Sequence, residues 1–408
     1  MASRRRGFVP DGHPRRPLLR LFFSAGLVAA LTVSATASDA SSRAASAPLK
    51  VVASNLNNPR KLFISADGAI YVVEAGTGGR DRCFGAGAAE VCVGLSGSIT
   101  RIANGAETRV VTGLWSGANP KGQQAEGPAD VLFRDGIYDI LLQDASINSR
   151  GFNALGPDGA TAGDLVSSPA GRVAPAVIVN FAAFEAARNP DKGAGPGAKF
   201  GDPPIDSDPY AFTPYRGGFA VADAAGNDLL WINSKGAVSV LAVFPTQTER
   251  LTRAVGKQIG APTTMRSISV QAVPSSVVVG PDGALYVGEL TGVPFEPGSA
   301  HIWRIAPGKK MSVYARGFTN ISDLAFDGKN LLVLEIDSQG LLHPKSSGAL
   351  IRLAPNGTRT VLASTGLVDP TGLAVGSGSI YISNYGLFPG NGAGPRGEVV
   401  RLPASAGS

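Results

Sequence analysis

Short apolar runs recur along this chain, and each is introduced by proline or asparagine and followed by a turn. The six introducing pairs are Asn58-Pro59, Gly127-Pro128, Asp208-Pro209, Val273-Pro274, Asn320-Ile321 and Asp369-Pro370. A second apolar run follows each turn, and the six read AIYVVE, IYDILLQD, GFAVAD, ALYVGE, LLVLE and SIYISN. Runs of this length between turn residues are typical of β-strands. The pattern indicates six copies of one unit.

A third run is present in five units as SITRI, LLWIN, HIWRI, ALIRL and EVVRL, and in the second unit we place it around Gly171-Arg172-Val173. A fourth run reads RVVTGL, AVIVNF, VSVLAVF, MSVYARGF and RTVLASTGL. Six units of four short strands are typical of a β-propeller. The inner runs are apolar on both faces, as expected where blades pack against each other. The predicted fold class is all-β, a six-bladed β-propeller with four-stranded blades.

The last unit lacks a fourth strand of its own. It ends at Val399-Val400-Arg401-Leu402, whereas the segment from Leu49 to Leu56 has the fourth-strand pattern and belongs to no unit. We expect this N-terminal strand to complete the last blade and close the ring, which removes the exposed sheet edges. The prediction is a single propeller domain over residues 48–404, followed by a short tail, 405–408.

The first 37 residues have the pattern of a secretory signal peptide. Six arginines precede a 13-residue apolar core, Leu21 to Val33, and Ala35-Thr36-Ala37 supplies the small-x-small cleavage pattern. A membrane anchor needs about 20 apolar residues, so we expect cleavage near Ala37, a flexible segment over 38–47, no membrane span afterwards, and a secreted or periplasmic protein. Arg5-Arg6 partly matches a twin-arginine signal, so both export routes stay open.

Cleavage changes the charge of the chain. The 408 residues contain 37 Lys and Arg against 31 Asp and Glu, a net charge of +6. The signal segment holds six of the arginines and one aspartate, so the mature chain keeps 31 basic and 30 acidic residues, a net charge of +1. No basic field remains to suggest that the protein binds nucleic acid.

The chain has two cysteines, Cys83 and Cys92, nine positions apart. In an exported protein a local disulfide is the favoured interpretation, with two free thiols as the alternative. Neither a histidine nor a further cysteine lies nearby to complete a zinc site.

Oxygen-bearing side chains occupy an equivalent position at the end of every second run. They are Glu74, Asp144 (or its neighbour Gln143), Asp223, Glu289, Glu335 and Asn384. The matching positions early in the first runs are Lys61, Asp130, Tyr210, Ser276, Asp323 and Gly372. In an antiparallel blade the start of the first strand and the end of the second lie at the same face. Because first strands surround the central channel, we expect both sets to form a rim around one mouth of it.

The long connections are predicted at this same face. They cover 75–96, 145–170, 183–207, 246–271, 290–300, 336–347 and 385–396, whereas the turns between first and second strands, such as Ala66-Asp67-Gly68, are short. Long loops gathered at one end of a rigid scaffold are where binding sites usually lie. This asymmetry places the candidate ligand-binding site at the loop-rich face.

The rim suggests several kinds of chemistry. Clustered carboxylates in a partly dry funnel raise one another's pKa values, so they could retain protons or pair with Lys61. They could instead bind calcium or magnesium, for which the candidate ligands are Glu74, Glu289, Glu335 and Asn384. The structural alternative is that these residues only accept hydrogen bonds from backbone donors of the neighbouring loop. His301 and His343 are candidate general bases or else solvated side chains.

Several segments resemble the ScyD/ScyE family. They are Asn57-Asn58-Pro59-Arg60-Lys61-Leu62, Asp67 to Gly76, the Cys83/Cys92 loop, Ser96 to Arg101, Arg109 to Leu114 and Gly127-Pro128-Ala129-Asp130. The resemblance covers nearly all of the mature chain and is most specific over residues 50–135. It implies an exported propeller of the NHL-like repeat kind and carries no catalytic set.

Two functions therefore compete, and whether the protein is an enzyme stays open. The first is binding of a small molecule or a protein partner at the loop-rich face. The second is a divalent-metal-dependent hydrolase, lactonase or lyase acting at the central funnel, similar to the gluconolactonase and strictosidine-synthase-like six-bladed enzymes. A quinone-cofactor dehydrogenase comes third, because no convincing histidine base accompanies it.

Overall fold

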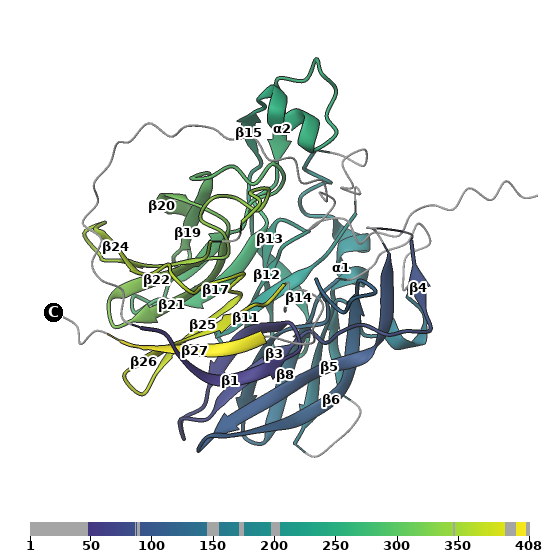
Figure 1. The fold of residues 1–408 in the computed structure, drawn as a ribbon, viewed down its shortest axis with the longest axis vertical. Coiled ribbons are helices and arrows are strands. Elements are labelled where there is room, and N and C mark those ends of the chain that lie inside the picture. The colour runs from purple at the N-terminus through teal and green to yellow at the C-terminus, as the bar shows by residue number, and fades with distance from the viewer. Residues whose placement is uncertain are drawn as a thin grey trace, which may run out of the picture.

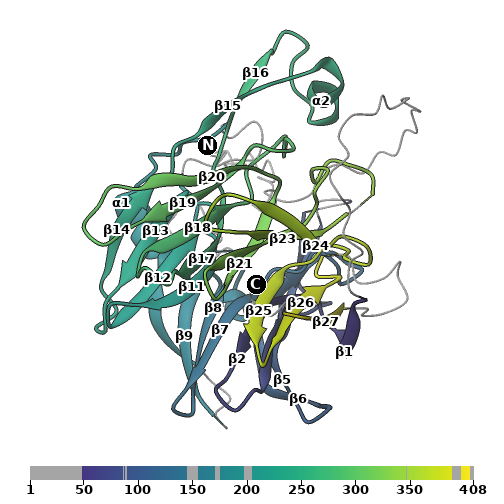
Figure 2. The same ribbon diagram turned by 90° about the vertical axis from the view of Figure 1, so that its left-hand side faces the viewer.

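Six antiparallel four-stranded blades surround a central channel in the computed structural model of the protein (Figures 1 and 2). The structure describes residues 48–85, 87, 90–144, 155–170, 175–196, 205–345, 347–387 and 397–404. The predicted signal peptide (1–37), the flexible segment (38–47) and the tail (405–408) lie outside the described residues. The six-bladed propeller predicted from the repeat is confirmed.

The first three blades follow one another along the chain. Blade 1 comprises β2 (Pro59–Ile64), β3 (Ile70–Glu74), β5 (Val91–Ala103) and β6 (Ala106–Ala118). Blade 2 comprises β7 (Pro128–Arg134), β8 (Ile137–Leu142), β9 (Asp164–Pro169) and β10 (Ala176–Asn180). Blade 3 comprises β11 (Pro209–Tyr215), β12 (Gly218–Asp223), β13 (Asp228–Ile232) and β14 (Val238–Val243).

The other three blades complete the ring. Blade 4 comprises β17 (Pro274–Val279), β18 (Leu285–Glu289), β19 (Ala300–Ile305) and β20 (Ser312–Phe318). Blade 5 comprises β21 (Ile321–Asp327), β22 (Asn330–Glu335), β23 (Ala349–Leu353) and β24 (Arg359–Ala363). Blade 6 comprises β25 (Gly372–Gly376), β26 (Ser379–Asn384), β27 (Gly397–Pro403) and the N-terminal β1 (Lys50–Leu56).

The N-terminal strand closes the ring as the sequence predicts. β1 pairs antiparallel with β27, and Lys50 faces Arg401 in the register. The first strand of each blade contacts the first strands of both neighbours, from β2 round to β25 and back to β2. Chain ends that meet within one blade lock the circle, because the last blade cannot complete its sheet without the N-terminal strand.

Several connections predicted as loops contain structure of their own. The 75–96 connection holds β4 (Cys83–Phe84) and the start of β5, and the Cys83–Cys92 disulfide joins these two strands. The helix α1 (Phe181–Arg188) follows β10 directly. The 246–271 connection forms the hairpin of β15 (Gln247–Arg250) and β16 (Ser267–Val270) with α2 (Arg253–Gln258) between them, and it projects from the ring (Figure 1).

One predicted strand is wrongly placed. The third strand of blade 2 is β9, Asp164–Pro169, inside the segment predicted as a loop, and it follows the short 3-10 helix η2 (Pro157–Gly159). The predicted position, Gly171-Arg172-Val173, lies outside the described residues. The β9 sequence DLVSSP has only two apolar residues, so it lacks the signature of the other third strands. Its burial comes from packing between blades, which outweighs strand propensity.

The apolar core is divided among the six interfaces between blades. Each interface has its own cluster of buried side chains, such as the one of Val73, Ile99 and Val111 from blade 1 with Ile140 and Val166 from blade 2. The other five clusters join the remaining pairs of neighbouring blades. Second strands are buried on both faces for this reason, as the unbroken apolar runs predicted.

The sheet register places the two predicted residue sets at one face. Each second-strand terminus faces the start of its first strand, as in Pro59↔Glu74, Pro274↔Glu289 and Ile321↔Glu335. Among the described residues, no helix is long and apolar enough to cross a membrane.

Candidate functional site

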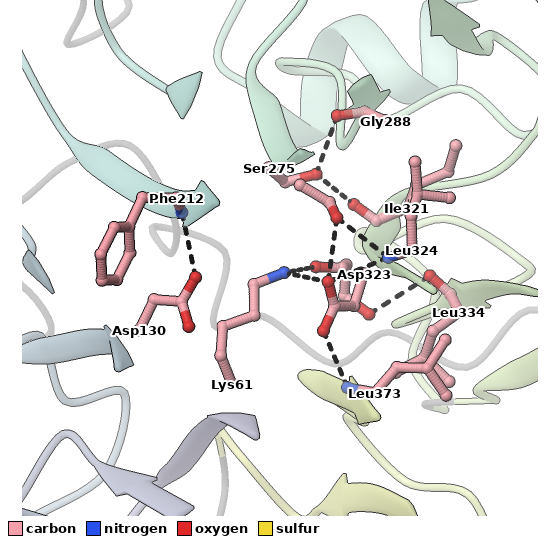
Figure 3. A network of polar contacts seen from close by, with 12 residues as sticks. Lys61, Asp130, Phe212, Ser275, Gly288, Ile321, Asp323, Leu324, Leu334 and Leu373 are labelled. Atoms are coloured by element: carbon pink, nitrogen blue, oxygen red, sulfur yellow. Dashed lines mark hydrogen bonds and ion pairs between the residues drawn. The ribbon is translucent and has the colours of Figure 1, made fainter. Parts of the chain in front are cut away.

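The first-strand residues converge in the central channel. The Lys61 ammonium of β2 lies 2.7 Å from Asp323 Oδ1 of β21 and donates to the Ser322 carbonyl at 2.6 Å (Figure 3). Lys61 belongs to blade 1 and Asp323 to blade 5, so this ion pair joins two blades that are separated in the ring by blade 6. Both side chains are more than nine-tenths buried. The pair therefore links non-adjacent blades in a nearly dry environment.

Asp323 is also bonded to the strands on either side. The Ser276 hydroxyl of β17 donates to Asp323 Oδ1 at 2.9 Å, and the Leu373 N–H of β25 donates to Oδ2 at 2.8 Å (Figure 3). The Leu324 N–H donates in turn to the Ser276 hydroxyl at 2.9 Å. These side chains connect blades 4, 5, 6 and 1 through their innermost strands.

Asp130 has the same role between blades 2 and 3. Its carboxyl accepts from the Phe212 N–H of β11 at 3.0 Å (Figure 3). It also accepts from the N–H of its neighbour Val131 at 2.8 Å. Burial raises the pKa of Asp130 to about 7, although the nearby Lys61 charge acts in the opposite direction. Lys61 also lies 5.5 Å from the centre of the Tyr210 ring, a cation–π contact. The predicted channel set is thus brought together.

The second-strand termini lie on the same face and contact backbone donors. In four blades this side chain accepts from an N–H just before the first strand: Glu74 from Asn57, Asp223 from Asp208, Glu335 from Thr319, and Asn384 from Val368, at 2.7–2.8 Å. These are the contacts expected if the residues that end the second strands only accept hydrogen bonds from backbone donors of the neighbouring connection. A side-chain acceptor at this place fixes the entry of the chain into each blade.

Glu74 and Glu289 each have further partners of their own. Glu74 pairs with Arg109 at 3.0 Å, and Glu289 accepts from the indole of Trp303 at 2.5 Å and contacts His301 Nδ1 at 3.0 Å. His301 is buried in this network, whereas His343 is exposed. Neither histidine lines the channel pocket described below.

The four candidate metal ligands do not form one ligand group. Glu74, Glu289, Glu335 and Asn384 come from blades 1, 4, 5 and 6, each with the partners given above. Within the described ranges, one set of three His, Cys, Asp or Glu residues has its ligand atoms within 4.8 Å of one another, namely Cys83, Glu90 and Cys92. The two cysteines of that set form the predicted disulfide, with an S–S distance of 1.96 Å.

A pocket lies above this network at the loop-rich mouth of the channel, and all six blades contribute to it. Its cavity volume is about 40 Å³. Blades 1 to 3 and their connections supply the polar side, which comprises Arg60, Gln124, Glu126, Gln143 and Tyr210. Blades 4 to 6 supply the apolar side, which comprises Val273, Leu290, Ile336, Leu341 and Leu387. The pocket thus has one hydrogen-bonding wall and one hydrocarbon wall.

Carboxyl groups gather around the polar wall, where Glu126 lines the pocket and Asp144, Asp206 and Asp208 lie near it without lining it. Burial raises the pKa of Glu126 well above its usual range, and the neighbouring Asp144 and Asp208 charges raise it further. The side chains of Glu126 and Asp144 are hydrogen-bonded to each other. Burial also raises the pKa of Asp208 to about 7 and that of Asp206 well above its usual value. Burial thus favours the neutral form of each of these three carboxyl groups.

Arg60 is the cation of this wall, and its two terminal nitrogens donate to backbone carbonyls, whereas its Nε has no partner among the described residues. Its guanidinium donates to the carbonyls of Asn58, Pro59, Ala125 and Gly386. Gln143 is 3% exposed, and its Oε1 also has no partner among the described residues. The wall therefore offers the free amide oxygen of Gln143, whereas the terminal nitrogens of Arg60 fix the surrounding backbone.

The sequence predicts only part of this wall. Asp144 and Tyr210 belong to the predicted rim, whereas Arg60, Glu126, Asp206 and Asp208 do not. Glu126 and Asp208 lie in the connections just before Pro128 and Pro209. Their position relative to those prolines was the sequence signal that could have identified them. A residue just before a first strand lies beside the end of a second strand, which brings it to the same mouth.

Backbone strain accompanies the pocket on its blade 4 side. Val273 (φ 50°) and Thr291 (φ 68°) are β-branched residues in the left-handed region, where such residues are rare. Val273 lines the pocket, and Thr291 lines the smaller adjoining one. Asn58, Asn320 and Asp369 have the same left-handed conformation, with φ of 43–50°, just before the first strands of blades 1, 5 and 6. The conformation of Val273 therefore belongs to the way the chain enters these blades.

Comparisons with known proteins give a likeness of fold. Neither a family model nor a curated protein matches the sequence. Among solved structures, a PQQ-bound aldose sugar dehydrogenase from Streptomyces coelicolor is 12% identical, with a TM-score of 0.47 over 87% of this chain and 98% of that one. A streptogramin B lyase is 13% identical, with a TM-score of 0.44 over 87% and 96% of the two chains. A virginiamycin B lyase from Staphylococcus aureus is 12% identical, with a TM-score of 0.42 over 87% and 100%. These similarities concern the β-propeller architecture alone.

Proposed function

We propose that this protein is an exported β-propeller that binds a small organic molecule in the channel pocket. The observation that carries the proposal is the lining of that pocket, to which all six blades contribute a polar wall and an opposed apolar wall. Ligand sites are usually concave and mainly apolar, with a few convergent polar groups. The resemblance of the sequence to the ScyD/ScyE family supports export.

The charges around the pocket favour a neutral or cationic ligand. Four acids, Glu126, Asp144, Asp206 and Asp208, accompany one arginine, whose terminal nitrogens donate to backbone carbonyls. An anion would add a like charge beside these acids and oppose their ionisation, whereas a cation would favour it. We therefore expect an amphipathic molecule with hydroxyl or amine groups on one edge and a hydrocarbon or aromatic face on the other.

A second candidate function is acid–base catalysis in the same pocket, as in a hydrolase or lyase. The favouring observation is the hydrogen-bonded Glu126–Asp144 pair, in which burial and the neighbouring Asp144 and Asp208 charges raise the pKa of Glu126, a residue that lines the pocket. Such a pair could protonate a leaving group or a carbonyl oxygen. Calcium or magnesium at the funnel stays a prediction, because its four candidate ligands are in separate blades, each with other partners.

The test is a small-molecule screen by saturation-transfer NMR on the mature chain, using neutral, cationic and anionic amphipathic compounds. We expect hits among the first two classes, and loss of binding in Leu341→Arg, which places a long cation in the pocket. Val361→Arg is the matched control, because Val361 is 51% exposed and lies on an outer strand. Binding that survives Leu341→Arg unchanged would place the ligand elsewhere and overturn the proposal.

The same hits separate binding from catalysis. Incubation of esters and lactones among them with wild type and with Glu126→Gln, followed by mass spectrometry, reports turnover. A product formed by wild type and not by Glu126→Gln supports the enzyme. Binding without any product supports the non-catalytic protein.

A further inference from the structure

A separate group of buried carboxylates lies at the loop-rich end of blade 3. Asp228 begins β13 and faces Asp223, the last residue of β12, in the sheet register. Glu185 comes from α1, and Asp191 comes from the segment that follows this helix. The Asp191 carboxylate accepts from the Asn227 amide at 2.9 Å, which holds that segment against the turn between β12 and β13. None of the four lines the channel pocket.

Two members of this group lack hydrogen-bond partners. Asp228 is 1% exposed, and neither of its carboxyl oxygens has a partner among the described residues. Glu185 is 2% exposed, and its Oε1 is likewise without a partner there. Asp191 and Asp223, by contrast, accept backbone N–H groups, at 2.8 Å from Gly193 and 3.0 Å from Gly226. A buried carboxyl without a partner is costly, so the orphan oxygens of Asp228 and Glu185 point to a missing ligand.

Counter-charge is missing as well. Across the ranges that the structure describes, none of the four acids forms an ion pair with lysine, arginine or histidine. Four neighbouring acids without a counter-charge repel one another when they are ionised. A bound cation would reverse this effect.

We propose that Glu185 and Asp228, with Asp191 beside them, bind a calcium ion between α1 and blade 3. All the donors are carboxylate oxygens, which suits a hard cation. Calcium accepts six to eight oxygen ligands in irregular arrangements and is often completed by water, whereas magnesium demands a near-ideal octahedron. The carboxylate oxygens lie farther apart than in a compact ligand set. Binding therefore draws Glu185 and Asp228 together and fixes α1 and the Asp191 segment against blade 3.

The test uses the mature protein stripped with EDTA and then titrated with calcium chloride at pH 7.5. We expect one ion per chain by isothermal titration calorimetry. We also expect the melting temperature to rise by about 3–5 °C at a calcium concentration 100-fold above Kd. Asp228→Asn and Glu185→Gln should each abolish the rise. Asp135→Asn, at an exposed position, should keep it.

The order of stability of wild type and Asp228→Asn, measured without and with calcium, distinguishes an ion site from acids that are only protonated. Without calcium, Asp228→Asn should be at least as stable as wild type, because it removes a repelled charge, and with calcium it should be less stable. Glu335→Gln, at a predicted ligand of the funnel, should leave the calcium response intact. The proposal is overturned if wild type shows no calcium response. A response that survives both Asp228→Asn and Glu185→Gln, or that only Glu335→Gln removes, overturns it too.

Discussion

Lys61 of blade 1 and Asp323 of blade 5 are 262 residues apart in sequence, yet their charged atoms lie 2.7 Å apart in the central channel. The pair is almost completely buried and is joined by hydrogen bonds from Ser276 and Leu373, so it links blades 4, 5, 6 and 1. It forms the floor beneath the proposed binding pocket, since Ser322, whose carbonyl accepts from Lys61, lines that pocket.

Removal of one partner from this pair should be strongly destabilising. Lys61→Met leaves a buried carboxylate unpaired, and we expect a loss of about 3–5 kcal/mol in the free energy of unfolding, measured with urea. The double variant Lys61→Met/Asp323→Asn should recover part of that loss. The control pair is Arg304–Asp282, with about one third of each side chain exposed. Arg304→Met should cost no more than about 1 kcal/mol. Equal costs for Lys61→Met and Arg304→Met would contradict the role given to Lys61.

Ring closure by the N-terminal strand gives a second prediction. Ala53 and Leu56 of β1 are 3% and 1% exposed, and β1 supplies the fourth strand of blade 6. Deletion of residues 48–56 removes this buried surface and opens a sheet edge. We expect a loss of more than about 3 kcal/mol. Deletion of residues 38–47 is the control and should leave the melting temperature unchanged. Equal stability of the two deletion variants would show that the ring does not depend on β1.

The pH dependence of stability follows from acids such as Asp130. Its pKa in the folded state is raised to about 7, above the value of about 3.9 in an unfolded chain. The folded state therefore binds more protons between these values, and stability falls as pH rises from about 4 to about 7. For Asp130 alone the fall amounts to about 4 kcal/mol. Urea unfolding at pH 5 and pH 8 should show wild type more stable at pH 5, and Asp130→Asn should reduce the difference. A difference of unchanged size would show that Asp130 ionises normally.

Export gives a fourth prediction. The small-x-small pattern at Ala35-Thr36-Ala37 places cleavage before Ser38. N-terminal sequencing of the protein from an exporting bacterial host should therefore begin at Ser38. Ala37→Arg should block processing and leave the longer chain. Mature protein that still begins at Met1 would contradict the signal-peptide interpretation.

Much of the fold follows from the sequence because propeller blades repeat. The paired runs and the unassigned N-terminal strand were enough to predict six blades and their closure, since each strand has a fixed place in its unit. β9 was misplaced because DLVSSP is buried through packing with neighbouring blades and has little apolar signal of its own. Tertiary context decides such strands, and a single sequence does not show it.

The sequence predicts where the candidate site lies better than it predicts which chemical groups surround it. Lys61, Asp130, Tyr210 and Asp323 were predicted from register alone, because the first strands share one alignment. Glu126 and Arg60 were missed, because their importance depends on contacts between blades rather than on a repeated position. The carboxylates that end the second strands were identified, but their backbone contacts appear only once the connection before each first strand is placed in space.

A crystallographic fragment screen on the mature protein tests the central claim most directly. Crystals soaked with neutral and cationic amphipathic fragments at pH 7 should show fragments in the channel pocket. Their polar edge should contact Glu126 and Gln143, and their apolar face should lie on Leu290 and Leu341. Parallel soaks with anionic analogues should leave the pocket empty. Fragments that gather elsewhere, or anions that enter the pocket as readily as neutral compounds, would contradict the proposed function.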